Sequence, residues 1–383
     1  MISLLFVDDE PEILAGLRRM LRAHRFEWDM WFADGADAGL VLLAEHQFDV
    51  VVTDMRMPGT DGAELLACVR RLQPSAVRIV LSGHADESSA QRSLPVAHQF
   101  LSKPCEPDRL QAVITHALEL RSQLRDVSLL ELVGSVSALP SPSASVVQLQ
   151  ALLAEPDADP DRVADVVASD VAMSSKLLQV VNSAFYGLSR SVDDPAEAVR
   201  LLGAPVVGEI VLCNELLDGF RARRLDRDAE ERLRLVQAVS AARAQLALVI
   251  AIETGRSRGE QRRIWSEAFF ADIGDVLFLG LDTTGTCEVD ARTRRLAGAA
   301  LLEIWGLPHH LVETVASADR VPGVAASEGH VVTWLAQQLL GEPEQRDPNV
   351  PAAFDRLRLP NDGGARLRDA VNQVRAGLVE AIA

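Results

Sequence analysis

The first 120 residues alternate between short apolar runs and stretches with helical spacing. The opening run, residues 2–7, carries no charge, which is typical of a strand buried on both faces of a parallel sheet. Four similar runs follow, separated by helical patterns or by the polar stretch 85–93. They cover residues 27–32, 48–53, 77–82 and 96–102. Five strands alternating with helices predict a doubly wound α/β fold with a five-stranded parallel sheet.

Polar residues follow the ends of these predicted strands. They are Asp8, Asp9, Asp54, Ser82 and Lys103. Because the carboxyl ends of parallel strands meet at one edge of the sheet, we expect these side chains to converge there. Three close carboxylates repel one another unless a cation is present, and hard oxygen donors suit Mg²⁺. A carboxylate in such a site can attack a phosphoryl group, whose oxygens the metal and the lysine would stabilise.

The motifs around these residues resemble those of a response-regulator receiver domain (CheY-like, flavodoxin-like fold). They read Phe6–Glu10, Thr53–Gly59 with Asp61–Gly62, Leu81–Gly83 and Phe100–Pro104. All of them occur in order and at family spacing within residues 1–121. The resemblance implies that Asp54 is the phosphoacceptor and that the phosphoryl donor is a sensor histidine kinase.

The same resemblance assigns roles to the other residues of the edge. Asp9 and Asp54 would bind Mg²⁺ directly, Asp8 through water, and the backbone carbonyl of Arg56 would add a ligand. Lys103 would bind the phosphoryl group. Ser82 and Phe100 occupy the two switch positions, and Arg56 and His84 match the positions that tune dephosphorylation.

From residue 145 to about 340 the helical period dominates, which predicts an all-α domain. Several segments of this region resemble the HDOD family, whose fold is similar to that of HD-type phosphohydrolases. They are residues 138–140, 157–159, 169–187, 196–203 and 296–308. The resemblance covers residues 130–330 and implies a signalling output that binds another, unidentified protein.

The metal ligands of HD phosphohydrolases are missing from this pattern. Those enzymes use a separate His, a His-Asp pair and a later Asp, but the chain has no His-Asp dipeptide, and Ala271 precedes Asp272 where the pair would lie. Residues 233–252, where the first ligand is expected, contain no His. We therefore predict a non-catalytic output. A divergent HD-type phosphohydrolase and a domain that binds a nucleotide or cyclic nucleotide without hydrolysing it are the alternatives.

Turn residues and changes of pattern set the expected boundaries. We predict a receiver domain at 1–121, a helical linker at 122–135 and an HDOD domain at 136–340. Residues 341–383 would form a loop followed by an amphipathic helix. The receiver helix that begins at residue 107 either ends near Arg125 or runs on through the linker.

Charge and cysteine usage limit the expected partners and compartment. The 38 basic and 55 acidic residues give a net charge of −17, which argues against nucleic acid or an anionic membrane as the main partner. The 4 cysteines form no Cys-x-x-Cys pair, which favours a reducing compartment. With no signal-peptide pattern and no apolar run of about 18 residues, we expect a cytoplasmic protein that can form a homodimer.

Overall fold

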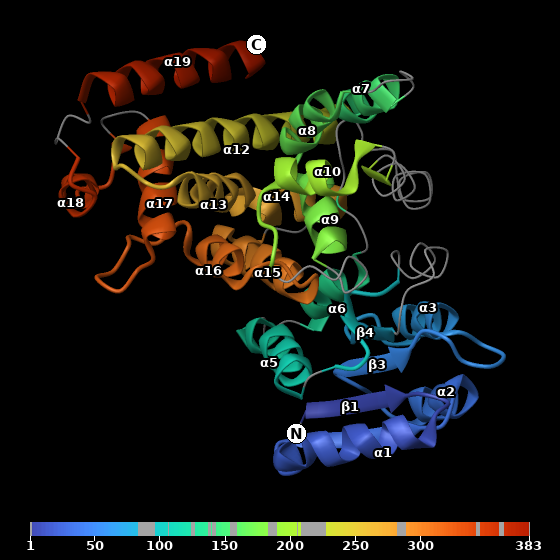
Figure 1. Ribbon diagram of the computed structural model, residues 1–383. Coiled ribbons are helices and arrows are strands. Elements are labelled where there is room, and N and C mark those ends of the chain that lie inside the picture. The colour runs from blue at the N-terminus through green and yellow to red at the C-terminus, as the bar shows by residue number, and fades with distance from the viewer. Residues whose placement is uncertain are drawn as a thin grey trace. The chain divides into compact units, whose positions relative to one another are not determined.

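Figure 1 shows the computed structural model, in which the chain divides into two compact units. Unit 1 comprises Met1–Ala138, Gln179–Ser191 and Ala300–Leu307, and unit 2 comprises Leu139–Leu178, Val192–Ala299 and Pro308–Ala383. The structure describes residues 2–82, 96–105, 107–123, 127–136, 139, 143–153, 159–182, 190–204, 206–207, 227–281, 289–341, 345–359 and 364–382.

The five predicted strands form one sheet in unit 1. They are β1 (Ile2–Val7), β2 (Trp28–Ala33), β3 (Val50–Asp54), β4 (Val77–Ser82) and β5 (Gln99–Ser102). All neighbouring strands are parallel, in the order β2-β1-β3-β4-β5. Most side chains of the central strands β1, β3 and β4 are buried, which explains their largely apolar sequence. The doubly wound α/β prediction is confirmed.

Three strands begin later than their runs suggested, and β2 does so by one residue, at Trp28. Strand β3 starts at Val50, because the backbone N–H of Phe48 donates to the buried side chain of Gln73 (2.8 Å) and not to a neighbouring strand. Strand β5 starts at Gln99, although the apolar run begins at residue 96.

Helices connect the strands of unit 1. They are α1 (Pro11–Met20) with the 3₁₀ turn η1 (Leu21–His24), α2 (Ala36–Glu45), α3 (Gly62–Leu72), α5 (Pro107–Gln123) and α6 (Val127–Ser135). Asp61 caps α3, since its Oδ1 accepts from the backbone N–H of Glu64 at 2.9 Å. The predicted linker, residues 122–135, therefore contains a helix of its own.

Unit 1 also takes in two segments from later in the chain. Gln179 donates from Nε2 to the backbone carbonyl of His98 at 3.1 Å. Gln99 donates in the same way to the carbonyl of Glu303 at 2.9 Å. The unit thus contains more than the sheet and helices expected for residues 1–121.

Helices make up the described part of unit 2, as the sequence predicted. Two of them, α9 (Val171–Val181) and α15 (Ala291–Ile304), contribute their last residues to unit 1. The others are α7 (Ser143–Leu153), α8 (Pro160–Ala168), α10 (Pro195–Leu202), α12 (Arg227–Glu253), α13 (Arg258–Phe269) with η4 (Phe270–Asp272), α14 (Ile273–Leu281), α16 (His309–Ser317), α17 (Glu328–Leu340), α18 (Val350–Arg356) and α19 (Gly364–Ile382).

Helix α12 is the central element of this bundle. It packs against α13, α17 and α19, and Figure 1 shows α19 running alongside it. The expected C-terminal amphipathic helix buries its apolar residues Leu367, Val371 and Val374. Within the described residues, α12 is the one helix long and apolar enough to cross a membrane by length and composition. Half of its apolar window is buried in the protein, as expected for a core helix.

A pair of glycines lets α14 and α15 approach closely. A Cβ at Gly274 would lie 2.1 Å from the carbonyl oxygen of Arg294, and one at Gly298 would lie 2.6 Å from the backbone nitrogen of Gly274. Because these neighbours are backbone atoms, they cannot move aside as a side chain would. The two helices need glycine at their crossing point.

We predict that Gly298→Ala lowers the free energy of unfolding by about 1–3 kcal/mol, because the new methyl group overpacks the crossing. The matched control is Gly377→Ala in α19, where a Cβ meets nothing within 4 Å. This control should leave stability unchanged or raise it by up to about 1 kcal/mol through helix propensity. Urea unfolding followed by circular dichroism measures both. Equal effects of the two substitutions would contradict the close crossing.

Candidate functional site

Three polar residues predicted for the sheet edge come together there. Asp8 follows the last residue of β1, Asp54 is the last residue of β3, and Lys103 follows β5. The strands are parallel, so these ends lie at the same edge. Asp8 is 1% exposed and Asp54 8% exposed, so both carboxylates are largely removed from water.

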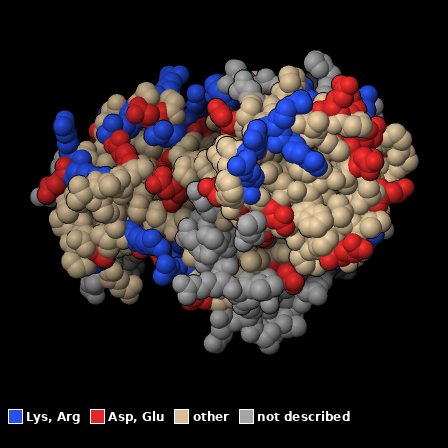
Figure 2. Space-filling model, turned by 90° about the horizontal axis from the view of Figure 1, so that it is seen from below, with Lys and Arg blue, Asp and Glu red and all other residues tan. Residues whose placement is uncertain are grey.

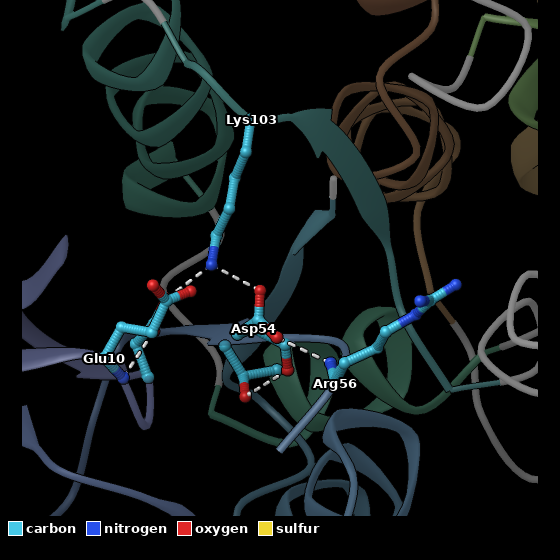
Figure 3. A network of polar contacts seen from close by, with 6 residues as sticks. Glu10, Asp54, Arg56 and Lys103 are labelled. Carbon is cyan, nitrogen blue, oxygen red and sulfur yellow. Dashed lines mark hydrogen bonds and ion pairs between the residues drawn. The ribbon is translucent and has the colours of Figure 1, made fainter. Parts of the chain in front are cut away.

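The ammonium group of Lys103 joins the two carboxylates (Figure 3). Its Nζ lies 2.6 Å from Asp8 Oδ2 and also forms an ion pair with Asp54 Oδ1. Burial alone would lower the pKa of Lys103, but the hydrogen bonds to Asp54 and Asp8 outweigh burial and raise it above its usual value. Lys103 is therefore a fixed positive charge between two negative ones.

The backbone around Asp54 fixes its other carboxylate oxygen. The N–H of Arg56 donates to Asp54 Oδ2 at 2.6 Å (Figure 3). Helix α3 begins directly against this residue, and a Cβ at Gly62 would lie only 2.1 Å from the Asp54 carbonyl oxygen. The glycine of the Asp61–Gly62 pair is thus required by the close approach of α3 to the end of β3.

The remaining predicted site residues are placed as follows. Asp9 is half-buried next to Asp8, and the Arg56 side chain is exposed. Phe100 is 4% exposed and pairs with Val80 in β5 and β4. Ser82 is the last residue of β4, and His84 lies outside the described residues.

The carboxylate oxygens at this edge meet some of the requirements for binding a small hard cation. Asp8 and Asp54 both point at Lys103 Nζ, so their oxygens face one position. Nowhere in the described ranges, however, do three His, Cys, Asp or Glu side chains gather closely enough to hold a metal ion, so Asp9 does not complete a ready-made cluster. Mg²⁺ usually keeps several waters and needs few protein ligands, so two converging carboxylates suffice for it.

In unit 2, the side chain of Arg243 forms an ion pair with the carboxylate of Asp272. The Arg243 guanidinium, on α12, lies 2.5 Å from Asp272 Oδ2, and Ser240 donates to the same oxygen at 3.4 Å. Arg243 is 3% exposed and also donates to the side chain of Gln337 (2.6 Å). Ala271, which stands where a His-Asp pair would begin, is buried. The Asp272 carboxylate is thus neutralised by a cation that the chain itself supplies.

A buried carboxyl in unit 2, that of Glu267, was missed by sequence reasoning. Glu267 on α13 is 2% exposed and lies 3.9 Å from Nε2 of His310, which in turn lies 3.2 Å from Asp193 Oδ2. Gly329 makes room for it, since a Cβ there would overlap its carboxyl group. Burial raises the pKa of Glu267 to about 8, against the opposing effect of the Arg263 charge. His310 and Gly329 come from α16 and α17, far from Glu267 in the sequence, so no local pattern could have revealed this environment.

Comparison with family models agrees with the α/β fold of the N-terminal region and the helical fold of the region that follows. The family model for the response regulator receiver domain matches residues 4–115, and the model for the HDOD domain matches residues 139–296. The fold and the sheet edge thus define a receiver-type module of two-component signalling. The chain contains a response regulator receiver domain followed by an HDOD domain.

Curated relatives match the receiver region. The hydrogenase transcriptional regulatory protein HoxA of Cupriavidus necator is 34% identical over 34% of this chain and 27% of its own length. The transcriptional regulatory protein FixJ of Bradyrhizobium diazoefficiens is 35% identical over 29% of this chain and 54% of its own length. The chain therefore spans only about a quarter to a half of these relatives.

Two solved structures are similar to parts of this chain. A signal receiver domain of an HD domain-containing protein from Pseudomonas fluorescens is 30% identical, covering 32% of this chain and 98% of that one, with a TM-score of 0.30. The MmoQ response regulator from Methylococcus capsulatus is 19% identical, covering 61% of this chain and 98% of that one, with a TM-score of 0.48. The assignment above rests on the family models.

We predict that Glu267→Gln removes a pH dependence of stability. Because the pKa of Glu267 is higher in the folded chain than in the unfolded one, the folded state binds its proton more tightly. Stability from this group is therefore complete below the ordinary carboxyl pKa and is lost as pH rises toward about 8. The variant should melt roughly 5 °C or more above the wild type at pH 9, with the difference shrinking toward pH 5.

Differential scanning calorimetry of both proteins from pH 5 to 9 measures this difference. Glu231→Gln, at an exposed position on α12, is the control and should follow the wild type at every pH. A constant offset between Glu267→Gln and wild type across the range would show that Glu267 is ionised throughout.

Proposed function

We propose that the chain is a two-component response regulator in which a sensor histidine kinase phosphorylates Asp54. Phosphorylation would control a non-catalytic output, in which the HDOD domain binds another protein. The observation that carries this proposal is the convergence of Asp8, Asp54 and Lys103 at one edge of a parallel sheet. Receiver relatives such as FixJ support the two-component context.

The geometry suits phosphoryl transfer to Asp54. A carboxylate oxygen of Asp54 would attack the phosphorus of a phosphohistidine as the phosphorus–nitrogen bond breaks and the departing imidazole takes up a proton. The Arg56 N–H holds one carboxylate oxygen in place. The Lys103 ammonium stands beside the other, where it would stabilise the oxygens of the transferred group.

Asp8 and Asp54 would hold Mg²⁺ at this edge, with Asp9 and the carbonyl of Arg56 as further ligands. When bound, Mg²⁺ supplies positive charge that neutralises phosphoryl oxygens. Asp8 is already oriented for this role, because its Oδ1 accepts from the N–H of Glu10 at 3.0 Å. Its other oxygen faces Lys103.

Ser82 and Phe100 would report the modification to the rest of the chain. Ser82 ends β4, and Phe100 is buried in the adjacent strand β5. A hydroxyl drawn toward the phosphoryl group would leave space for the aromatic ring to reorient. Arg56 and His84 would tune the rate of dephosphorylation.

The proposed organisation is a receiver at 1–121, a linker at 122–135, an HDOD domain at 136–340 and a C-terminal loop and helix at 341–383. We propose that the protein is cytoplasmic, that its downstream partner is a protein and that it can form a homodimer. We propose neither nucleic acid nor a membrane as a partner, and the net charge of −17 supports this exclusion. On the face shown in Figure 2, basic and acidic side chains are interspersed.

The ion pair between Arg243 and Asp272 supports a non-catalytic HDOD domain. A hydrolytic metal needs anionic or imidazole ligands free to bind it. Here Asp272 is held by a buried guanidinium, and Ala271 supplies no ligand. A metal bound at Asp272 would have to compete with the Arg243 guanidinium for the same carboxylate.

We predict that Asp54→Asn abolishes phosphorylation of the chain by acetyl phosphate with Mg²⁺. The amide has no anionic oxygen with which to attack phosphorus. Intact-mass spectrometry should show a hydroxylamine-sensitive phosphoryl adduct on the wild type and none on the variant. Asp37→Asn, at an exposed position in the first turn of α2, is the control and should be phosphorylated normally. Equal labelling of Asp54→Asn and wild type would contradict the assignment.

We also predict that the full chain retains no stoichiometric iron, manganese or zinc after incubation with each metal and desalting. Elemental analysis by mass spectrometry measures the metal content. A bound metal that is lost in Asp272→Asn but kept in Asp290→Asn, an exposed control in the same unit, would instead favour a divergent phosphohydrolase.

A further inference from the structure

Strand β4 contains an arginine where its apolar neighbours predict an apolar residue. Arg78 lies between Val77 and Ile79 and is 1% exposed. The oxygens that accept its hydrogens are backbone carbonyls, at Val96 (2.6 Å from Nε), Ala76 (3.2 Å from Nη1), Pro74 (3.4 Å from Nη1) and Gly134 (2.8 Å from Nη2). A buried guanidinium satisfied by loop and helix carbonyls holds those backbone segments in place.

His98, which immediately precedes β5, completes the arrangement. The backbone N–H of Arg78 donates to its Nδ1 at 3.1 Å. Its Nε2 lies 2.6 Å from Arg78 Nη2 and 3.0 Å from the carbonyl oxygen of Gly134. The guanidinium, the imidazole and the Gly134 carbonyl are thus in mutual contact.

This carbonyl belongs to the last turn of α6. Carbonyls at the end of a helix lack partners within the helix, and a cation placed there also interacts favourably with the helix dipole. Helix α6 approaches so closely that a Cβ at Gly134 would lie 2.3 Å from the carbonyl oxygen of Pro74. Residue 134 must therefore be glycine for the helix end to reach the arginine.

We propose that Arg78 and His98 form a docking site for the C-terminal end of helix α6, and that phosphorylation of Asp54 releases this end. The second half of this inference rests on the proposed function. It makes α6 the movable element between the receiver sheet and the following chain, in place of a passive linker.

The position of the docking site supports this coupling. Arg78 is on the strand that ends at Ser82, and His98 lies two residues before Phe100. A displacement of Ser82 or Phe100 would therefore be transmitted along β4 or β5 to the docking site. The carbonyl of His98 also accepts from Gln179, so the same residue contacts a helix of the HDOD match. Helix α6 is docked in this structure, so the proposed response is its release.

Hydrogen exchange of the full chain tests the docking. In Gly134→Ala, the new methyl group would keep α6 away from Pro74, and amides 127–135 should exchange roughly tenfold faster or more. Gly16→Ala on α1 makes the same change in a helix of the same unit where a Cβ meets nothing within 4 Å, and it should leave α6 protected. Arg78→Lys, which keeps the charge but not the planar fork, should expose α6 as well. Equal protection of α6 in Gly134→Ala and Gly16→Ala would overturn the docking.

Beryllofluoride with Mg²⁺, a mimic of the phosphoryl group, tests the release. In the wild type it should protect peptides around Asp54 and at the same time speed exchange in 127–135, whereas in Gly134→Ala the exposed α6 should not respond. Protection at Asp54 with unchanged α6 exchange would overturn the release but not the proposed function. A mimic that changes nothing around Asp54 would contradict the proposed function, while the glycine comparison without mimic would still decide the docking.

Discussion

The candidate site depends on the ammonium group of Lys103, which compensates two buried carboxylates. Strand β4 lies between β3 and β5, so the lysine must reach across roughly 10 Å of sheet to bring its charge to Asp54. Burying the Asp8 and Asp54 carboxylates without a cation would be costly, because each would lose its hydration. The raised pKa of Lys103 shows that the pairing exceeds the lysine's own cost of burial. Strand order and charge balance therefore determine the site together.

Carboxyl groups in this chain reach charge balance in different ways. Asp54 is paired with a lysine, Asp272 with the guanidinium of Arg243, and Glu267 becomes protonated because burial raises its pKa to about 8. Asp272 and Glu267 differ because the charged side chains beside them differ in how strongly water screens them. The Arg263 charge near Glu267 is 44% exposed, so water screens it, whereas Arg243 is only 3% exposed. The environment of each group, and not its residue type, decides its chemical state.

Most of the fold and the centre of the candidate site could be predicted from sequence, because both depend on local patterns. Apolar runs gave the five strands, and the rule that parallel strands end at one edge placed Asp8, Asp54 and Lys103 together. The role of Arg78 could not be predicted, although a charge inside a doubly buried strand was a signal that it must have special partners. Those partners come from residues as distant as Gly134, and only the folded backbone brings them together.

The chemistry of the Arg78 docking site makes it suited to switching. An apolar contact weakens gradually as two surfaces slide apart, whereas a buried guanidinium is stabilised only while its hydrogen bonds are made. Withdrawal of the Gly134 carbonyl would leave the Nη2 donor of Arg78 without that acceptor in a buried position. Intermediate positions of α6 are therefore less favourable than either the docked or the released position with water at the arginine. Under the proposed release, a helix held in this way would respond to a small strand displacement in an all-or-none manner.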